Sequence, residues 1–170
     1  MNILLTGNNG YIGTVLMDTL LKKGYSVTGL DVNYFESCSL EPINQKLKQI
    51  VKDIRTVDID DVVGFDSVIH LAGLSNDPLG ELNPGLTEEI NFHGTVNIAQ
   101  LAKKAGVKRF VYASSQSMYG ISDTENELDE DTSEKNPVTA YARTKWEAEL
   151  ELKKMHNNDF VVACFRPSTV

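Results

Sequence analysis

The chain has 170 residues, of which 41% are hydrophobic and 24% are charged, and these ordinary values argue against a disordered protein. Its net charge of −8 argues against nucleic-acid binding through phosphate contacts, which needs a basic face. The two cysteines lack metal-binding or disulfide-scaffold spacing, no stretch is long or apolar enough to cross a membrane, and the N-terminus lacks a signal peptide, so we expect a cytoplasmic protein without a metal site.

Short β-rich runs alternate with amphipathic helical stretches along the chain. The first half predicts a strand at 3–5, a helix at 10–23, a strand at 26–31, a short helix at 43–48, a strand at 49–52, a weak helix at 57–63 and a strand at 66–72. The second half predicts a helix at 83–105, a strand at 109–114, a mobile surface loop at 120–136, a helix at 137–155 and a strand at 160–166. Asn83 and Pro84 are typical of a helix start, and Gly106 of a helix end.

Strands that are regularly separated by helices predict βαβ units and a parallel sheet covered on both faces. The strands are apolar without strict alternation, which agrees with burial on both sides. We therefore expect one α/β domain over residues 1–170, a Rossmann-type doubly wound parallel sheet in three α/β/α layers.

A glycine-rich loop follows the first predicted strand and opens the first predicted helix. It reads Thr-Gly-Asn-Asn-Gly-Tyr-Ile-Gly over residues 6–13. Gly7 would permit a tight turn, Gly10 would let the backbone approach a pyrophosphate, and Gly13 would let helix and strand pack closely. The helix N-terminus would then offer free N–H groups and the positive end of its dipole to the phosphates.

Asp31 lies at the end of the second predicted strand. A carboxylate at this place accepts hydrogen bonds from the adenosine ribose hydroxyls, and it repels a 2′-phosphate. The residue therefore predicts NAD as the cofactor in preference to NADP. In the alternative interpretation the glycines only form turns, and Asp31 is a surface residue.

Tyr141 and Lys145 are four residues apart on a predicted helix and therefore share one face. A tyrosine hydroxyl has a pKa of about 10 when unperturbed, and a neighbouring ammonium and a bound nicotinamide cation would lower that pKa. Tyr141 could then act as a general acid and base on a substrate hydroxyl. The alternative is an exposed pair that recurs by chance in many helices.

With these motifs in this order, the whole chain resembles the extended short-chain dehydrogenases/reductases, especially the nucleotide-sugar epimerases and dehydratases. Residues 53–54 resemble the Asp-hydrophobic pair that holds the adenine, and residues 70–73 resemble the motif beside the cofactor, with Gly73 where Ala is more usual. Residues 91–95 are similar to the Asn-x-x-Gly-Thr helix motif, whose Asn91 braces the sheet. Residues 114–120 resemble the Ser-Ser-x-x-x-Tyr-Gly segment.

The resemblance implies that Ser115, Tyr141 and Lys145 are catalytic, with Ser114 the less favoured hydroxyl. It implies cofactor contacts from the glycine loop, the strand ends and the catalytic helix: Gly7, Asn9, Gly10, Tyr11, Ile12, Gly13, Asp31, Val32, Asn33, Asp53, Ile54, Leu71, Ala72, Gly73, Tyr141, Lys145 and Pro167. It implies substrate contacts from Ser75, Ser115, Gln116 and Tyr141. His70 is expected to be a strand residue and not a base.

The implied activity is the NAD-dependent epimerisation of a nucleotide-diphosphate sugar. Tyr141 would remove a hydroxyl proton while hydride passes to the nicotinamide, and the keto-sugar would then be reduced again on its other face. Ser115 would position the reacting oxygen, and Lys145 would lower the pKa of the tyrosine and hold the nicotinamide ribose. The resemblance also implies a homodimer built from the helices that follow the fourth and fifth strands.

Three alternatives remain open. A reductase of the same family would consume its cofactor stoichiometrically. A dehydratase is disfavoured because Gln116 and Ser117 stand where that branch carries an Asp-Glu pair. A nucleotide-sensing or scaffolding protein would keep the cofactor site without needing the three catalytic residues.

The resemblance also predicts a further C-terminal region that carries the sugar-nucleotide site and is absent from this chain. Residues 1–170 would then be the NAD-binding domain of a longer protein. We expect the 170 residues alone to bind NAD weakly and to turn over no substrate.

Overall fold

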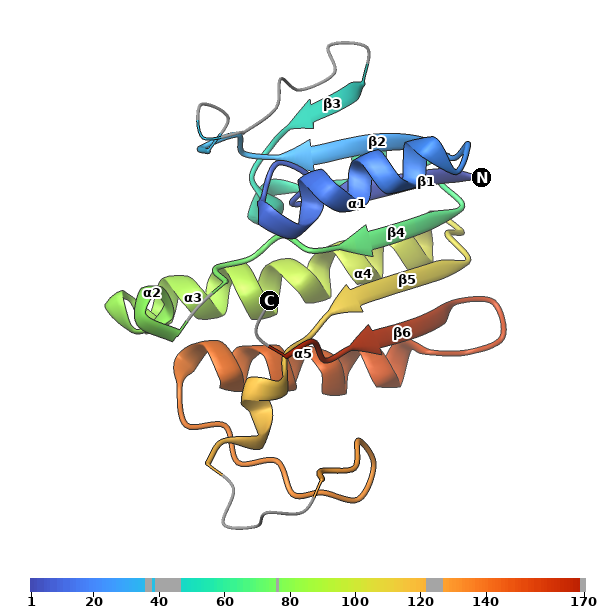
Figure 1. Cartoon of the computed structure of the whole chain (residues 1–170). Helices are drawn as coiled ribbons and strands as arrows, with labels where there is room; N and C mark the ends of the chain where they lie inside the picture. Colours follow the sequence, from blue (N-terminus) through green and yellow to red (C-terminus); the bar gives the residue numbers. More distant parts are fainter. Residues whose placement is uncertain (36–37, 39–46, 76, 122–126, 169–170) are drawn as a thin grey trace.

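The computed structural model of the chain describes residues 1–35, 38, 47–75, 77–121 and 127–168. Six parallel strands form one sheet in the order β3-β2-β1-β4-β5-β6 (Figure 1). The strands are β1 (Asn2–Thr6), β2 (Ser26–Asp31), β3 (Lys48–Val51), β4 (Ser67–His70), β5 (Arg109–Ala113) and β6 (Val161–Phe165). This is the Rossmann-type α/β fold that the sequence predicts, and the strand order reverses between β1 and β4, where such sheets bind ligands at the carboxyl ends of the strands.

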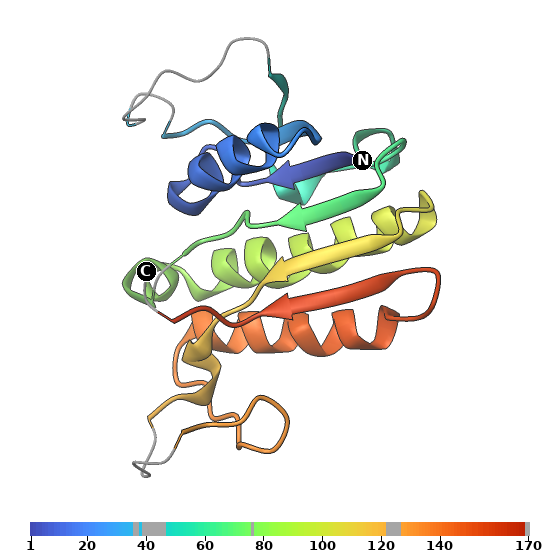
Figure 2. The ribbon, with the colours of Figure 1, turned by 45° about the vertical axis from the view of Figure 1, so that its right-hand side comes forward.

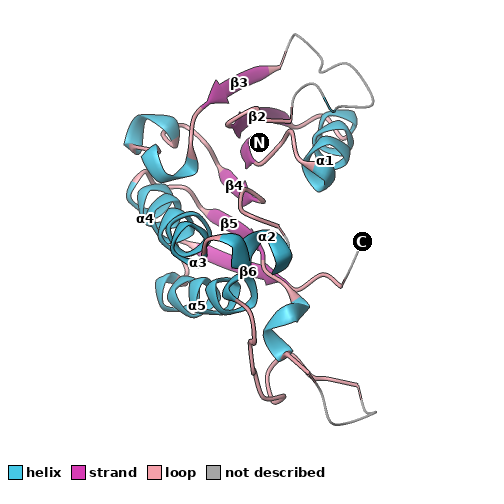
Figure 3. Ribbon diagram, turned by 90° about the vertical axis from the view of Figure 1, so that its left-hand side faces the viewer, coloured by secondary structure: helices cyan, strands magenta, loops and turns pink. Residues whose placement is uncertain are grey.

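The helices lie on both sides of the sheet. They are α1 (Tyr11–Lys22), α2 (Asp77–Leu82), α3 (Pro84–Thr87), α4 (Thr95–Lys104) and α5 (Ala140–Met155). Figure 3 shows α1 on one side of the sheet, and α4 and α5 on the other. Figure 2 shows α4 and α5 side by side behind β4, β5 and β6. The three-layer arrangement is therefore confirmed in the described part of the chain.

Two hydrophobic clusters explain why the strands are apolar on both faces. On β1, Leu4 packs into the cluster under α4 and α5, whereas Ile3 and Leu5 pack into the cluster under α1. Successive side chains of a strand point to opposite faces, so a strand covered on both faces needs apolar residues at nearly every position.

The predicted weak helix at 57–63 is wrong. Only a single 3₁₀ turn forms there, at Ile59–Asp61, and a second turn that the sequence analysis missed forms at Ile54–Thr56. The Asp58 carboxylate accepts a hydrogen bond from the Asp60 N–H at 3.0 Å, and Lys52 pairs with Asp58 and Asp61. Side-chain acceptors that bond nearby N–H groups compete with a longer helix.

The predicted helix at 83–105 begins and ends as expected but is interrupted. Asn83 caps its start by accepting from the Leu86 N–H at 3.0 Å, and Gly106 ends it with a positive φ of 81°. Between α3 and α4, Glu88–Gly94 is a π-helical segment. Such segments are frequent at functional sites, and this one carries Asn91.

Two further helix predictions need correction. The helix predicted at 137–155 begins only at Ala140, because the Thr139 hydroxyl accepts from the Ala142 N–H and caps it there. Helix α2 was not predicted. Most of the short helix predicted at 43–48 lies outside the described residues, and Lys48 belongs to β3.

The predicted loop at 120–136 is irregular where it is described. Residues 122–126 lie outside the described part, and residues 127–136 form turns in which the Asp129 carboxylate accepts from the Thr132 N–H at 2.7 Å. The Arg166 guanidinium donates to the Glu130 carbonyl at 2.7 Å and ties this segment to the end of β6. The mobility of the loop stays a prediction.

Candidate active site

The glycine loop packs so closely that two of its glycines cannot carry a side chain. A Cβ on Gly7, whose φ is +71°, would lie 2.7 Å from the Ala72 nitrogen. A Cβ on Gly13 would lie 2.1 Å from the Gly7 carbonyl oxygen. Contacts this short with backbone cannot relax cheaply, so both residues must be glycine for the first helix to meet the sheet in this way.

The N-terminus of α1 is open for an anion. Its cap residue, Gly10, makes no side-chain hydrogen bond to the first turn, and the next two residues, Tyr11 and Ile12, are exposed. The first N–H groups of a helix have no partner within the helix and carry partial positive charge. This cradle fits a pyrophosphate, and a larger residue at Gly10 would approach the Gly7 carbonyl to 3.3 Å.

The Asp31 carboxylate is held rigidly at the end of β2. Its two oxygens accept hydrogen bonds from the Asn9 N–H at 3.2 Å and from the Asn33 N–H at 2.9 Å. The Asn9 side chain in turn donates to the Asn33 side chain at 2.5 Å, and Asn33 has a left-handed φ of 62°. Val32 lies between them and is half-buried. The loop and the acid predicted to bind the ribose therefore form one unit.

Asn8 contributes to this unit and was missed by the sequence analysis. Its amide is 2% exposed and exchanges two hydrogen bonds with the Gln49 amide, at 2.9 and 3.2 Å. Gly29 makes room for the pair, because a Cβ there would lie 2.5 Å from the Asn8 side chain. A spacing rule for the glycines says nothing of the residues between them, so no sequence signal pointed to Asn8.

Replacing Gly13 by alanine tests the close packing of the loop. We expect the free energy of unfolding to fall by about 2 kcal/mol, because the methyl group would displace backbone. The affinity for NAD should fall as well, because the displaced backbone belongs to the loop that is predicted to hold the phosphates. Thermal unfolding and calorimetric titration measure the two effects. Gly85→Ala is the matched control, since its Cβ would meet only the Asn83 side chain at an ordinary 3.6 Å, and an equal loss in both variants would contradict the packing argument.

Asp53 and Ile54, the residues predicted to hold the adenine, make contacts within the protein. The Asp53 carboxylate caps the turn that follows it and pairs with Arg55 at 2.7 Å, and this pairing lowers the pKa of Asp53 below its usual value. Ile54 is 5% exposed and packs into the core under α4, in contact with Gly94. Their contact with adenine stays a prediction.

The segment after β4 is braced by the π-helical segment. The Asn91 amide accepts from the Leu74 N–H at 2.8 Å and donates to the Leu74 carbonyl at 3.0 Å. A Cβ on Gly73 would lie 2.8 Å from the Asn91 side-chain oxygen, so this arrangement of Asn91 leaves no room for the alanine that the resemblance would suggest. Leu71 and Ala72 are half-buried beside the glycine loop, and Ser75 is exposed.

Lys145 is the buried cation of the site. It is 5% exposed, and its ammonium donates to the Ala113 carbonyl at 2.8 Å. Burial lowers its pKa to about 8, so at neutral pH the side chain is still mostly protonated. The ammonium lies 5.8 Å from the centre of the Tyr141 ring.

Tyr141 and Ser115 meet at the carboxyl end of β5. Burial raises the pKa of Tyr141 above its usual value, a hydrogen bond with the Ser115 hydroxyl lowers it, and the charge of Asp77 raises it further. In the chain by itself, the cost of burying a phenolate therefore outweighs the hydrogen bond with Ser115, and the lowering expected from the ammonium together with a bound nicotinamide cation stays a prediction.

Helix α2 positions the start of α5. The Thr139 hydroxyl bonds the Asp77 carboxylate, and the Ala140 N–H donates to the Glu81 carboxylate at 2.5 Å. A Cβ on Gly80 would lie 3.2 Å from the Tyr141 Cβ, so α2 packs directly against the tyrosine. This support comes from residues far away in the chain, which explains why the sequence analysis missed it.

The turn after β5 carries Ser115, the serine predicted to be catalytic. Ser115 is 6% exposed, and its hydroxyl accepts from the Ser117 N–H at 3.1 Å. Gln116 is exposed, and its N–H donates to the Pro167 carbonyl at 3.3 Å. The two positions after Ser115 are Gln116 and Ser117, so neither holds the acid that the argument against a dehydratase found missing.

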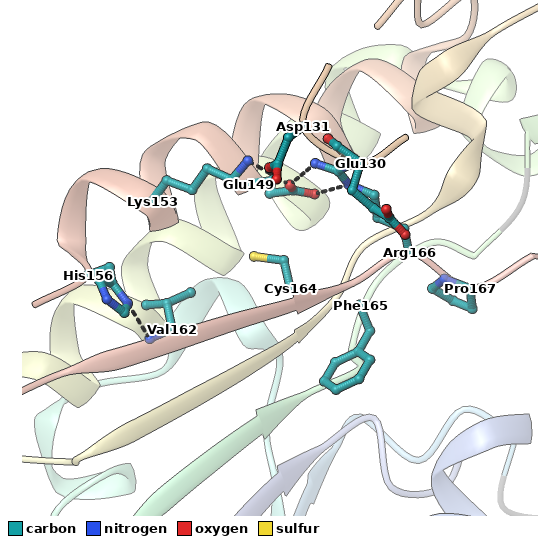
Figure 4. A pocket seen from close by; sticks show the side chains of 10 residues that line it. All are labelled: Glu130, Asp131, Glu149, Lys153, His156, Val162, Cys164, Phe165, Arg166 and Pro167. Carbon is teal, nitrogen blue, oxygen red and sulfur yellow. Dashed lines mark hydrogen bonds and ion pairs between the residues drawn. The ribbon is translucent and has the colours of Figure 1, made fainter. Parts of the chain in front are cut away.

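Ser114 has a structural role that separates it from Ser115. Its hydroxyl donates to the Glu149 carboxylate at 2.9 Å, and that carboxylate is 1% exposed and pairs with Arg166. Figure 4 shows Glu149 between Lys153 and Arg166, beside a cavity of about 650 Å³ along α5 and β6 that Tyr141 does not line. Glu149 was missed by the sequence analysis, although it lies four residues after Lys145 on the same helix.

Comparison with known proteins gives the family. A family model described as "NAD dependent epimerase/dehydratase family" matches residues 3–170. The chain belongs to this family.

Members of the NAD-dependent epimerase/dehydratase family resemble the chain over about half of their own length. A putative UDP-glucose 4-epimerase of Methanocaldococcus jannaschii is 33% identical over 160 residues, which cover 91% of this chain and 50% of the relative. Among solved structures, UDP-glucose 4-epimerase of Thermus thermophilus in complex with NAD has a TM-score of 0.85 at 26% identity, covering 98% of this chain and 54% of that one. MoeE5 in complex with UDP-glucose and NAD has a TM-score of 0.84 at 27% identity, covering 98% and 54%.

The described residues carry neither a membrane-crossing helix nor a metal cluster. None of the helices found there has the length and apolarity that a membrane crossing requires. No group of three or more His, Cys, Asp or Glu side chains in this part of the chain is arranged to hold a metal ion.

Proposed function

We propose that this chain is the NAD-binding part of an epimerase that acts on a nucleotide-diphosphate sugar by transient oxidation to a keto-sugar. One observation carries the proposal: Ser115, Tyr141 and Lys145 come together at the carboxyl ends of the strands, next to a glycine loop that fits a pyrophosphate. NAD, when bound, supplies the acceptor and donor of hydride.

The three residues have separate tasks in this proposal. Tyr141, whose hydroxyl lies near that of Ser115, takes the proton from the substrate hydroxyl during oxidation and returns it during reduction. Ser115 holds the reacting oxygen within reach of the tyrosine. Lys145 keeps one donor on the Ala113 carbonyl and has two further N–H groups for the nicotinamide ribose.

The chain spans about half the length of the relatives that it matches. We therefore propose that residues outside this stretch bind most of the sugar nucleotide, and that the 170 residues alone bind NAD weakly. Normal turnover by the chain alone would contradict this division of tasks. The homodimer and the cytoplasmic location stay predictions.

The cofactor preference is testable on the chain itself. Asp31→Asn should weaken NAD binding about tenfold and reduce the preference over NADP, because the loss of one charge-assisted hydrogen bond costs about 1.5 kcal/mol. Both oxygens of Asp31 accept backbone N–H groups, so the asparagine amide must also turn a donor toward one of them. Calorimetric titration with each nucleotide measures the effect. Asp18→Asn, on the exposed side of α1, is the control, and an unchanged preference in Asp31→Asn would remove Asp31 from the ribose site.

The epimerase is distinguished from its alternatives by product analysis on a full-length protein. An epimerase interconverts two sugar nucleotides without net change in NADH absorbance. Net oxidation of NADH would indicate a reductase instead, and a 4-keto-6-deoxy product would indicate a dehydratase despite Gln116 and Ser117. Absence of any turnover with retained NAD binding would favour a nucleotide-sensing protein.

A further inference from the structure

Lys145 is charged and buried without an acidic partner. In the described part of the chain, no carboxylate lies within ion-pair distance of its ammonium, which has the Ala113 carbonyl as its hydrogen-bond acceptor. The nearest aromatic ring is that of Tyr112, whose centre lies 4.9 Å from Nζ, closer than the ring of Tyr141 at 5.8 Å. A cation over an aromatic face is attracted by the ring quadrupole, and the attraction is strongest where water is excluded.

Tyr112 belongs to a row of side chains that crosses the sheet under the site. Thr6 pairs with His70, His70 with Tyr112, and Tyr112 with Cys164, one residue from each of β1, β4, β5 and β6. Residues in register on neighbouring parallel strands point to the same face of the sheet. The row is therefore a continuous strip of side chains on one face of the sheet. It begins at Thr6, next to the glycine loop, and passes Tyr112, over which Lys145 of α5 lies.

His70 holds the Tyr112 ring in place. The histidine is fully buried, and its two ring nitrogens contact the hydroxyls of Thr6 at 2.6 Å and Thr95 at 2.9 Å. Its ring stacks on Tyr112, with centroids 5.9 Å apart and planes at 16°. Burial, and secondly the charge of Lys145, lower the pKa of His70 to about 3, so the histidine is neutral and does not repel the ammonium.

The hydroxyl of Tyr112 does not explain why a tyrosine ring is placed there. It is fully buried near the Thr95 hydroxyl, yet it makes no hydrogen bond of good geometry with the residues that the structure describes. A buried hydroxyl without a partner costs free energy. The ring, and not the hydroxyl, makes the contacts with Lys145 and His70.

We infer that Tyr112 is a positioning residue for Lys145: its ring face, clamped by His70, keeps the ammonium charged and in place beneath Tyr141. The importance of this for catalysis rests on the function proposed above, in which Lys145 serves the nicotinamide ribose and the tyrosine. The contact itself is independent of which reaction the protein performs.

The titratable groups around Lys145 supply no negative charge that would stabilise its ammonium. His70 from β4 is neutral, and Tyr141 from α5 is a phenol whose pKa is raised. Asp77 from α2 acts on Tyr141, and Glu149 is engaged with Arg166 and Ser114. Burial raises the pKa of the Cys164 thiol to about 12, so this residue of β6 is neutral as well. Besides the Ala113 carbonyl, which accepts its hydrogen bond, the ring of Tyr112 is the nearest group that favours the charged lysine.

Titration of Lys145 by NMR tests the inference on this chain. The ¹³Cε signal of Lys145, assigned by its loss in Lys145→Met, is followed as the pH rises. In Tyr112→Leu the midpoint should fall by about one pH unit, because the cation–π attraction is lost. Tyr112→Phe keeps the ring and should titrate like the unaltered chain.

Phe110→Leu is the matched control. Phe110 lies on the same strand and is equally buried. Its ring also contacts that of His70, with the two ring centroids 6.0 Å apart. It should lose stability without moving the Lys145 midpoint. An unchanged midpoint in folded Tyr112→Leu, or an equal shift in Phe110→Leu, would overturn the inference. A shift confined to Tyr112→Leu, together with a full-length protein that turns over no sugar nucleotide, would support the inference and reject the proposed function.

Discussion

Turnover of a sugar nucleotide by the full-length protein should fall about 10²- to 10⁴-fold in Tyr141→Phe, the range that loss of a general acid and base costs. The phenylalanine keeps the ring and its packing against α2, but no hydroxyl remains near Ser115 to accept the substrate proton. The fall should appear in kcat, because the tyrosine hydroxyl acts on the reacting atom. Steady-state kinetics measure it, and calorimetric titration should show NAD binding near the original affinity.

Tyr25→Phe is the control for this result. Tyr25 lies just before β2, at the opposite end of the sheet from the site, and packs against the cluster under α1. The Tyr25→Phe substitution also removes a hydroxyl, but it should leave turnover unaltered. A Tyr141→Phe protein that retains most of its kcat would show that another group moves the proton.

Stability should fall by about 3 kcal/mol in Glu149→Gln, at the low end of what breaking a buried ion pair costs. The carboxylate is 1% exposed, and it accepts from Ser114 and pairs with Arg166 and Lys153. The substitution keeps the volume but leaves the Arg166 guanidinium, itself 9% exposed, without its counter-charge. Chemical denaturation of the chain at neutral pH measures the loss.

The same pair gives the stability a defined pH dependence. Burial acts to raise the pKa of Glu149, but hydrogen bonds from Arg166 and Ser114 and the Arg166 charge outweigh it, and the pKa lies below the ordinary glutamate value. The stabilisation is therefore present above the unfolded pKa and is lost as the pH falls through the folded pKa. The difference between the unaltered chain and Glu149→Gln should shrink in acid.

Glu151→Gln provides the comparison for this second result. Glu151 pairs with Lys154 at 2.6 Å on the exposed face of the same helix, with side chains 37% and 70% exposed. Such an exposed pair contributes less than about 1 kcal/mol to the free energy of unfolding. Equal losses in the two variants would mean that the burial of Glu149 has no energetic consequence.

The fold could be predicted because its signals are local. Apolar runs, Gly106 and the Asn83-Pro84 start lie within a few residues of the elements that they define, and the six strands were all found near their observed positions. The helix start at Thr139 and the turns at residues 54–61 were misjudged, because side chains of Thr139, Asp53 and Asp58 bond the backbone in ways that hydrophobic periodicity does not record.

The candidate site was predictable in part. The residues that carry its chemistry stand in recognisable spacings, so the sequence by itself determined the glycine loop, Asp31 and the pair of Tyr141 and Lys145. Their contact with cofactor and substrate stays a prediction. Asn8 with Gln49, Ser114 with Glu149, and α2 with Tyr141 join residues that are distant in the chain, and no spacing rule contains them.

What only the tertiary structure decided is the electrostatic balance at the site. A sequence shows that a lysine follows a tyrosine by four residues, but the pKa of each depends on how much water folding removes and on which dipoles and rings replace it. Folding buries Lys145 over Tyr112 and lowers its pKa to about 8, and it buries Tyr141 enough to raise its pKa. The types and order of the groups are therefore fixed by the chain, and their charges by the packing around them.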